Sequence, residues 1–276
     1  MPIAQSLDHF VVPVDDLVIA EEFYVQVFDG EITKRNGLNT RQRKRGAVPH
    51  TFIQIGGKRM GVYLQSETRP QPQHPRGLPT YSFTTTERGL EEVAMRLKQL
   101  GMTFDGPVRD ANSFARQSLF FTDPAGNYYS VYTPTASKEV SNNFKTRMTA
   151  VGYIELEAPD VKASINFYQN VLGFEIQSRN AKPQQATLKM ASGQTLILTE
   201  APFASKGLVM SRKVPGPHIA FYVPGANWTA AIAHLDKLGI ENGDRGAAKE
   251  RVEGQGGTYM DDPAGYVIQF ITDGME

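Results

Sequence analysis

The side chains available for chemistry in this sequence are imidazoles, carboxylates and phenols, because the chain contains five histidines and no cysteine. The lack of cysteine excludes a thiolate metal ligand, a cysteine nucleophile and a disulfide framework. His9 and His218 stand at the beginning of apolar stretches that predict strands, and a strand histidine taken alone is more often a hydrogen-bonded residue than a ligand. His50, His74 and His234 are interpreted as structural or solvent-facing.

One predicted strand, residues 153–157, has a pattern suited to acid–base chemistry. Tyr153, Glu155 and Glu157 alternate along it, so all three side chains face the same side. If that face lines a pocket, Glu155 is a candidate general base whose pKa is raised by burial, and Tyr153 is a second candidate for proton transfer. The alternative is that the strand is locally twisted, or that the acids pair with basic groups near the rim.

The composition of the chain argues against a nucleic-acid-binding protein and against a membrane-spanning helix. The 276 residues include 29 Lys and Arg and 29 Asp and Glu, and a net charge of zero argues against a nucleic-acid-binding protein. The sequence has no apolar run of the ~18–20 residues that a membrane helix needs. Its first residues also lack the basic and apolar regions of a signal peptide. We therefore expect a cytoplasmic protein with a small-molecule substrate and no membrane partner.

The elements that would position these residues occur twice, because the chain is a tandem repeat. Asp16, Phe23-Tyr24 and Glu31-Ile32 recur 144 residues later as Asp160, Phe167-Tyr168 and Glu175-Ile176. Near the end of each half, the turn sequence Asp123-Pro124-Ala125-Gly126 returns as Asp262-Pro263-Ala264-Gly265. Residues 135–146 are polar and suit an exposed linker between the two copies.

Hydrophobic periodicity predicts the same order of elements in both copies: strand, helix and strands, then a second such round. The helix after Asp16 has apolar positions Ile19, Phe23 and Val27 four residues apart. The remaining predicted helices and strands are 10–14, 51–55, 59–64, 81–85, 90–100, 117–122, 127–133, 153–157, 161–171, 228–238 and 267–271. The second copy also has a predicted hairpin that turns at Gly193 and a predicted strand that begins at Ile219. Four βαβββ-like modules follow from this order.

The spacing of Asp160, Phe167-Tyr168 and Leu172-Gly173-Phe174, together with Asp-Pro-Ala-Gly before the last strand, carries a resemblance. The chain resembles the glyoxalase, bleomycin-resistance protein and extradiol dioxygenase superfamily, also called vicinal oxygen chelate proteins. The resemblance covers nearly the whole sequence and appears twice. It implies an α+β fold with two tandem homologous halves, residues 1–135 and 147–276, whose four βαβββ modules pair into curved-sheet cups.

In this superfamily, metal ligands, typically His-His-Glu, come from the first and last strands of paired modules. The first-strand positions of modules one to four are His9, Thr80, Tyr153 and His218. The last-strand positions, in the same order, are Gly61, Ser130, Ile197 and Gln269.

Two pairings of the modules remain open. Sequential pairing gives one cup with His9, Thr80 and Ser130 and another with Tyr153, His218 and Gln269. Pairing of module one with module four gathers His9, His218 and Gln269 and leaves Thr80, Ser130 and Tyr153 in a metal-free cup.

The resemblance implies a divalent metal, Fe(II) or Mn(II), held by His9, His218 and Gln269, and a dioxygenase of the extradiol, ring-cleaving type acting on a small phenolic molecule. Tyr153 or Glu155 would move protons. A carboxamide does not neutralise metal charge as a carboxylate does, so Gln269 lowers the expected affinity. The alternatives are a metal-free binding protein of the bleomycin-resistance type and a glyoxalase-type isomerase, whose usual ligand pattern is in neither cup. Sheet edges also allow a homodimer.

Overall fold

The computed structural model describes residues 3–44, 47–65, 71–110, 112, 114–135, 147–181, 184–200, 216–244 and 255–273. Contacts divide the chain into two compact units, one of Met1–Val11 with Glu155–Glu276 and one of Val12–Ile154. The linker predicted at 135–146 lies, except for its first residue, outside the described residues. The division of the sequence at 135 and 147 therefore stays a prediction.

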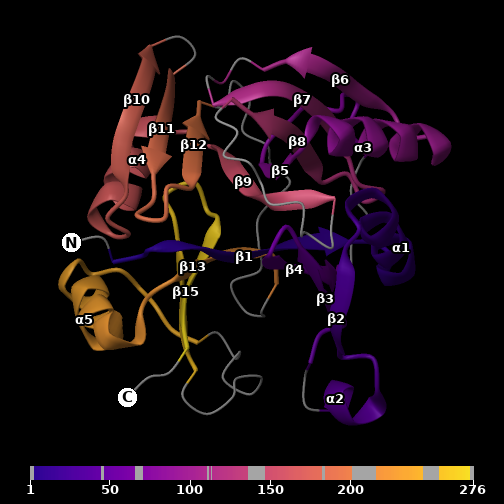
Figure 1. Cartoon of the computed structure of the whole chain (residues 1–276). Coiled ribbons are helices and arrows are strands. Elements are labelled where there is room, and N and C mark those ends of the chain that lie inside the picture. The colour runs from indigo at the N-terminus through magenta and orange to yellow at the C-terminus, as the bar shows by residue number, and fades with distance from the viewer. Residues whose placement is uncertain are drawn as a thin grey trace. The chain divides into compact units, whose positions relative to one another are not determined.

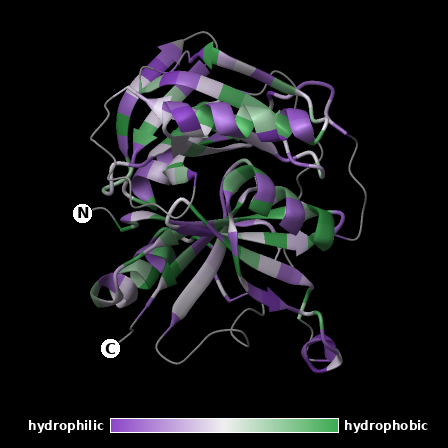
Figure 2. Ribbon diagram, turned by 45° about the vertical axis from the view of Figure 1, so that its right-hand side comes forward, coloured by the Kyte–Doolittle hydropathy of each residue, from purple (hydrophilic) through white to green (hydrophobic). Residues whose placement is uncertain are grey.

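The unit Val12–Ile154 contains the first two modules. The first has β1 (Ser6–Val14), α1 (Leu17–Phe28), β2 (Glu31–Asn36), α2 (Thr40–Lys44), β3 (His50–Ile55) and β4 (Lys58–Leu64). The second has β5 (Thr80–Thr85), α3 (Glu87–Gln99), β6 (Phe104–Arg109), β7 (Ala115–Thr122) and β8 (Tyr128–Pro134). Helix α3 packs on β5 to β8, whereas α2 is hydrophilic along its length (Figures 1 and 2).

The other unit contains the fourth module, the beginning of β1 and the third module except for Met148–Ile154 of β9. The third module has β9 (Met148–Glu157), α4 (Val161–Asn170), β10 (Glu175–Ala181), β11 (Gln184–Lys189) and β12 (Thr195–Thr199). The fourth has β13 (His218–Tyr222), the 3₁₀ turn η1 (Gly225–Asn227), α5 (Trp228–Lys237), β14 (Gly256–Asp261) and β15 (Val267–Thr272). No helix in the described ranges is long and apolar enough to cross a membrane.

The strands form two mixed sheets, which confirms the α+β fold. The seven-stranded sheet has the order β14-β15-β13-β1-β4-β3-β2, and the eight-stranded sheet has the order β10-β11-β12-β9-β5-β8-β7-β6. Strand β1 pairs antiparallel with β13, so module one is joined to module four, and module two is joined to module three through β5 and β9. The structure therefore excludes sequential pairing of modules.

Local sequence explains where the helices begin. Asp16 caps α1 by accepting hydrogen bonds from the backbone N–H groups of Val18 and Ile19, and Asp160 caps α4 in the same way. Of the three apolar positions four residues apart, Phe23 and Val27 are buried, whereas Ile19 is 51% exposed. Ile19 lies in the first turn of the helix, on its solvent side.

The two repeated motifs of the sequence contact each other within each half. The Tyr24 hydroxyl donates to Asp123 at 2.6 Å, and the Tyr168 hydroxyl donates to Asp262 at 2.9 Å. Each aspartate also accepts backbone N–H groups of its own turn, from Ala125 in the first half and from Ala264 in the second. The Phe-Tyr and Asp-Pro-Ala-Gly motifs are thus two parts of one buried contact between a helix and a turn.

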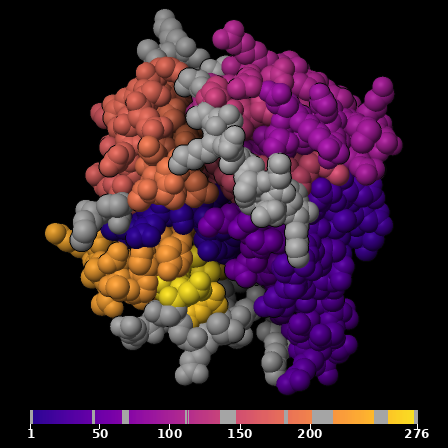
Figure 3. All heavy atoms as spheres, viewed as in Figure 1, coloured from indigo at the N-terminus to yellow at the C-terminus, as the bar shows by residue number. Residues whose placement is uncertain are grey.

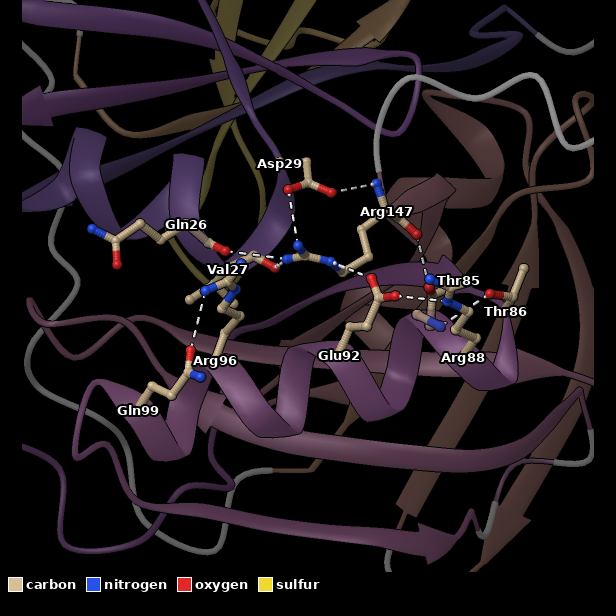
Figure 4. A network of polar contacts seen from close by, with 11 residues as sticks. Gln26, Val27, Asp29, Thr85, Thr86, Arg88, Glu92, Arg96, Gln99 and Arg147 are labelled. Carbon is tan, nitrogen blue, oxygen red and sulfur yellow. Dashed lines mark hydrogen bonds and ion pairs between the residues drawn. The ribbon is translucent and has the colours of Figure 1, made fainter.

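Arg147, just before β9, closes the end of α1 (Figure 4). Its guanidinium donates to the backbone carbonyls of Gln26 and Val27, which a helix leaves without intrahelical partners. It also forms ion pairs of 3.0 Å with Asp29 and with Glu92 of α3. One largely buried cation therefore ties together α1, α3 and the start of β9.

Candidate functional site

The strand register of the seven-stranded sheet places four side chains in one row. His9 lies opposite Ala220, Ala220 lies opposite Gln269, and Gln269 lies opposite Tyr259. Because residues directly opposite one another project from the same face of a sheet, these side chains share a face, and His218, two residues before Ala220, shares it too. This row runs from β1, the first strand of the chain, across β13 to β15, its last strand. In Figure 3, indigo residues from the beginning of the chain lie against orange residues from its last quarter.

The two histidines of this row are in direct contact. Their Nε2 atoms are 3.1 Å apart, and the ring centroids are 5.2 Å apart with an edge-on angle of 79°. His9, His218 and Gln269 each have only 4% of their surface exposed. The structure thus brings together the three side chains that were predicted to share a cup.

The other ring nitrogen of each histidine faces an acceptor. Nδ1 of His9 lies 2.5 Å from a carboxylate oxygen of Asp8, and Nδ1 of His218 lies 2.5 Å from the backbone carbonyl of Gly216. Both partners only accept, so both Nδ1 atoms carry the proton. In the neutral rings, the two Nε2 atoms are therefore both lone-pair acceptors that face each other.

Two acceptors 3.1 Å apart repel each other unless a cation or a proton lies between them. Two nitrogen ligands ~2.1 Å from one metal ion in adjacent octahedral positions are ~3.0 Å apart. Metal-binding histidines also characteristically donate the other ring N–H to a carboxylate or a backbone carbonyl. The histidine pair fits a divalent metal in both its spacing and its outer hydrogen bonds.

Gln269 adds a third donor. Its Oε1 atom is buried and has no hydrogen-bond partner among the described residues. A buried acceptor without a partner costs about 1–3 kcal/mol, and a cation bound beside the oxygen would remove this cost. No group of three or more His, Cys, Asp or Glu within the described ranges could hold a metal, so the amide oxygen is needed to complete a three-residue set.

Sequence analysis missed Tyr259, which contributes to the same face. Its ring lies edge-on to His218, with centroids 5.3 Å apart, and only 5% of its surface is exposed. It stands on β14, directly across from Gln269. The strand register, which a single sequence does not contain, is the signal that finds it.

Tyr153 and Glu155 lie on β9, in the eight-stranded sheet rather than beside the histidine pair. The Tyr153 ring packs against Phe114 and Tyr132, with centroids 5.5 and 5.6 Å away. Glu155 accepts a hydrogen bond of 2.6 Å from Thr199. The two candidate proton carriers are thus on a different sheet from the candidate ligands.

The other three histidines have the structural or exposed environments expected of them. His50 is fully buried, with Nδ1 donating to the carbonyl of Val48 and Nε2 facing the amide of Asn36. His74 is exposed, and Nε2 of His234 lies 2.7 Å from the carbonyl of Asn170.

Comparison with known proteins agrees with this fold. The sequence profile of the Glyoxalase/Bleomycin resistance protein/Dioxygenase superfamily matches residues 6–131 and again 150–270. An iron-dependent extradiol dioxygenase from Rhodococcus jostii (strain RHA1) is 26% identical over 119 residues. That match covers 40% of this chain and 40% of the relative.

Two solved structures cover nearly the whole chain. A candidate dioxygenase from Bacillus subtilis aligns over 100% of this chain and 88% of its own, with a TM-score of 0.71 and 14% identity. Glyoxalase I from Zea mays aligns over 98% of this chain and 92% of its own, with a TM-score of 0.63 and 16% identity. Together with the doubled sequence match, these findings show that the chain belongs to the Glyoxalase/Bleomycin resistance protein/Dioxygenase superfamily.

Proposed function

We propose that the chain is a metal-dependent dioxygenase of the extradiol type, acting on a small phenolic molecule through two neighbouring oxygens. The observation that carries the proposal is the contact of 3.1 Å between Nε2 of His9 and Nε2 of His218, in which the Nδ1 atom of each ring faces an acceptor. The partial sequence match to an iron-dependent extradiol dioxygenase supports the choice of reaction.

His9, His218 and the Oε1 atom of Gln269 would hold one divalent cation, Fe(II) or Mn(II). When bound, the cation would activate the substrate oxygens as a Lewis acid and serve as a template for them. None of the three side chains brings a negative charge, so the ligand set itself does not compensate the charge of the cation. This arrangement favours a substrate that brings its own negative charge, such as a phenolate, over a neutral alcohol.

The rest of the face orients the substrate and excludes water. Tyr259, with its ring against His218, supplies an aromatic wall and a hydroxyl on the same row as Gln269. Such a wall suits a flat, ring-shaped substrate. Tyr153 and Glu155, which lie on the other sheet, have no part in this proposal.

Metal analysis of protein purified without chelator tests the proposal. We expect wild type, reloaded with Fe(II) or Mn(II), to bind about one ion per chain, and His9→Ala and His218→Ala to lose it. Thr80→Ala, at the corresponding position of the other sheet, is the matched control and should retain the metal. Oxygen uptake with a catechol probe then tests the reaction, and equal metal content in all four proteins would refute the proposal.

A metal-free binding protein of the bleomycin-resistance type is the second candidate. The observation that favours it is the lack of a carboxylate among the three candidate donors, since no acidic group completes the set within the described residues. A binding protein would keep its affinity for an aromatic ligand after dialysis against chelator. A metal-dependent enzyme would lose it.

A further inference from the structure

The strand that carries His9 has an irregularity immediately before that residue. Leu7 pairs with Phe221 and His9 pairs with Ala220, so two steps along β1 correspond to one step along β13. Asp8 is the extra residue of this β-bulge. Bulges of this kind occur next to functional sites, where they redirect a side chain.

The bulge decides which face His9 occupies. Phe221 and Ala220 are neighbours on β13 and therefore project from opposite faces of the sheet. Their partners Leu7 and His9 consequently project from opposite faces as well, although residues two apart on a regular strand share a face. If β1 paired with β13 regularly, with Asp8 in the ladder and no bulge, His9 would lie on the face of Leu7, opposite to the face of His218.

The extra residue also contacts the histidine that it redirects. A carboxylate oxygen of Asp8 lies 2.5 Å from Nδ1 of His9, and the Asp8 side chain is 28% exposed while that of His9 is 4% exposed. Adjacent side chains on a regular strand point apart, so this contact depends on the bulge. The partly exposed position allows Asp8 to be replaced without opening a cavity in the core.

We propose that Asp8 is the positioning residue of the candidate metal site. Its carboxylate accepts the Nδ1 proton of His9, which fixes the tautomer that directs the Nε2 lone pair at His218. The backbone carbonyl of Gly216 performs the same task for His218. The predicted effect of Asp8 on metal binding rests on the proposed function. Its effect on the tautomer of His9 does not, because the tautomer can be measured in the metal-free protein.

Nitrogen NMR of ¹⁵N-histidine-labelled, metal-free protein, at a pH where the rings are neutral, tests the assignment directly. In wild type, we expect the proton of His9 on Nδ1. In Asp8→Ala, Nδ1 has lost its acceptor, and a proton on Nε2 can instead be donated to Nε2 of His218, so the Nε2–H tautomer becomes populated. His218 is the internal control, since its carbonyl partner is unchanged in every variant.

Affinity for Mn(II), measured by titration, gives the second readout. Asp8→Ala should bind Mn(II) about 10–100-fold more weakly than wild type, the usual effect of removing an outer partner of a ligating histidine. Asp8→Glu should restore part of the loss. Asp273→Asn, which removes an exposed carboxylate after β15, should bind like wild type. Asp8→Leu, which also removes the acceptor at this partly exposed position, is measured in the same two ways if Asp8→Ala does not fold.

The outcomes separate the two proposals. If wild type binds no Mn(II) or Fe(II), the proposed function fails, and the NMR comparison still decides the role of Asp8. If wild type binds metal while Asp8→Ala, or Asp8→Leu in its place, binds it equally well and keeps the Nδ1–H tautomer at His9, the assignment of Asp8 is overturned and the proposed function stands.

Discussion

The two sheets carry different side chains at the same positions of a common repeat. The seven-stranded sheet has His9, His218 and Gln269 at the first-strand and last-strand positions, all buried on one face. The eight-stranded sheet has Thr80, Tyr153 and Ser130 there. Tyr153 packs in a cluster of aromatic rings, and Thr80 donates to the carbonyl of Gly77. The fold tolerates either set, so chemistry can be confined to one sheet while the other contributes a core.

The helix–turn contacts show the opposite behaviour, because both halves keep them. Asp123 accepts from the hydroxyl of Tyr24 and the amide of Asn127, whereas Asp262, among the described residues, accepts from one side chain, that of Tyr168. Burial raises the pKa of Asp262 to about 6, against hydrogen bonds that lower it. The comparison shows that the repeat keeps the contacts between helix and turn and varies the side chains at the candidate ligand positions.

The largest expected effect comes from adding the missing carboxylate to one sheet. Gln269→Glu should tighten Mn(II) binding by about 100-fold, because it adds a negative charge among neutral donors. Without metal, the same change buries a carboxylate and should lower the melting temperature, and saturating Mn(II) should reverse this loss. Ser130→Glu, the equivalent change in the other sheet, should create no metal site. Calorimetric titration and thermal melts of both variants check this, and unchanged affinity in Gln269→Glu would argue against a ligand role for residue 269.

The next largest effect is a pH-dependent change in stability at the turn that contains Asp262. Because the folded-state pKa of Asp262 is raised to about 6, its contribution to stability is fully present below pH ~4. It is lost as the pH rises through about 6 and stays lost above pH ~7. Asn cannot ionise, so the stability of Asp262→Asn relative to wild type should rise by about 2 kcal/mol between pH 4 and pH 7.5. Urea unfolding at both pH values measures the difference, with Asp273→Asn as the control for removal of an exposed carboxylate.

A smaller effect should separate the two tyrosines of the repeat. The Tyr24 hydroxyl contacts both Asp123 and the hydroxyl of Tyr129, at 2.6 and 2.7 Å, and all three groups are buried. Tyr24→Phe should therefore lower the free energy of unfolding more than Tyr168→Phe, by about 1 kcal/mol, because it disturbs an additional hydrogen-bonded group. Chemical denaturation of the two variants gives the comparison, and equal losses would show that the contact with Tyr129 contributes little.

The smallest expected effect is on Mn(II) affinity, which one substitution in the eight-stranded sheet should leave almost unchanged. Tyr153→Phe in the eight-stranded sheet should change Mn(II) affinity less than about twofold, within the scatter of additive, distant substitutions. Its ring remains in the aromatic cluster with Phe114 and Tyr132. A clear loss of metal affinity in this variant would contradict the assignment of the site to a single sheet.

Most of the fold could be predicted from the sequence, because the helices and inner strands carry strong hydrophobic periodicity. The strands that the pattern did not locate are β2, β6, β10 and β14, and each is the edge of a sheet. Edge strands are often polar, which protects them from pairing with other chains, so β2 and β6 lack a clear alternation. In β14, two glycines at the start hide an otherwise buried strand.

The candidate site was harder to predict than the fold, because the residues that form it are distant in sequence. His9, His218 and Gln269 were identified through the family positions, but only the pairing of β1 with β13 brings them together. The bulge at Asp8 and the placement of Tyr259 depend on strand register. A single sequence specifies register weakly, since a slip of one residue exchanges the two faces of a strand.

The pairing of β1 with β13 has a consequence for how the protein is made. His9 and His218 are 209 positions apart in the chain. At about 5–20 residues per second, the ribosome needs roughly 10–40 seconds to synthesise the intervening segment. During that interval the apolar strand after His9 has no β13 to pair with, and the histidine pair does not exist. Any metal site built on this pair can therefore form only after β13 has been synthesised, and a nascent chain halted before β13 would leave one edge of β1 without its partner strand.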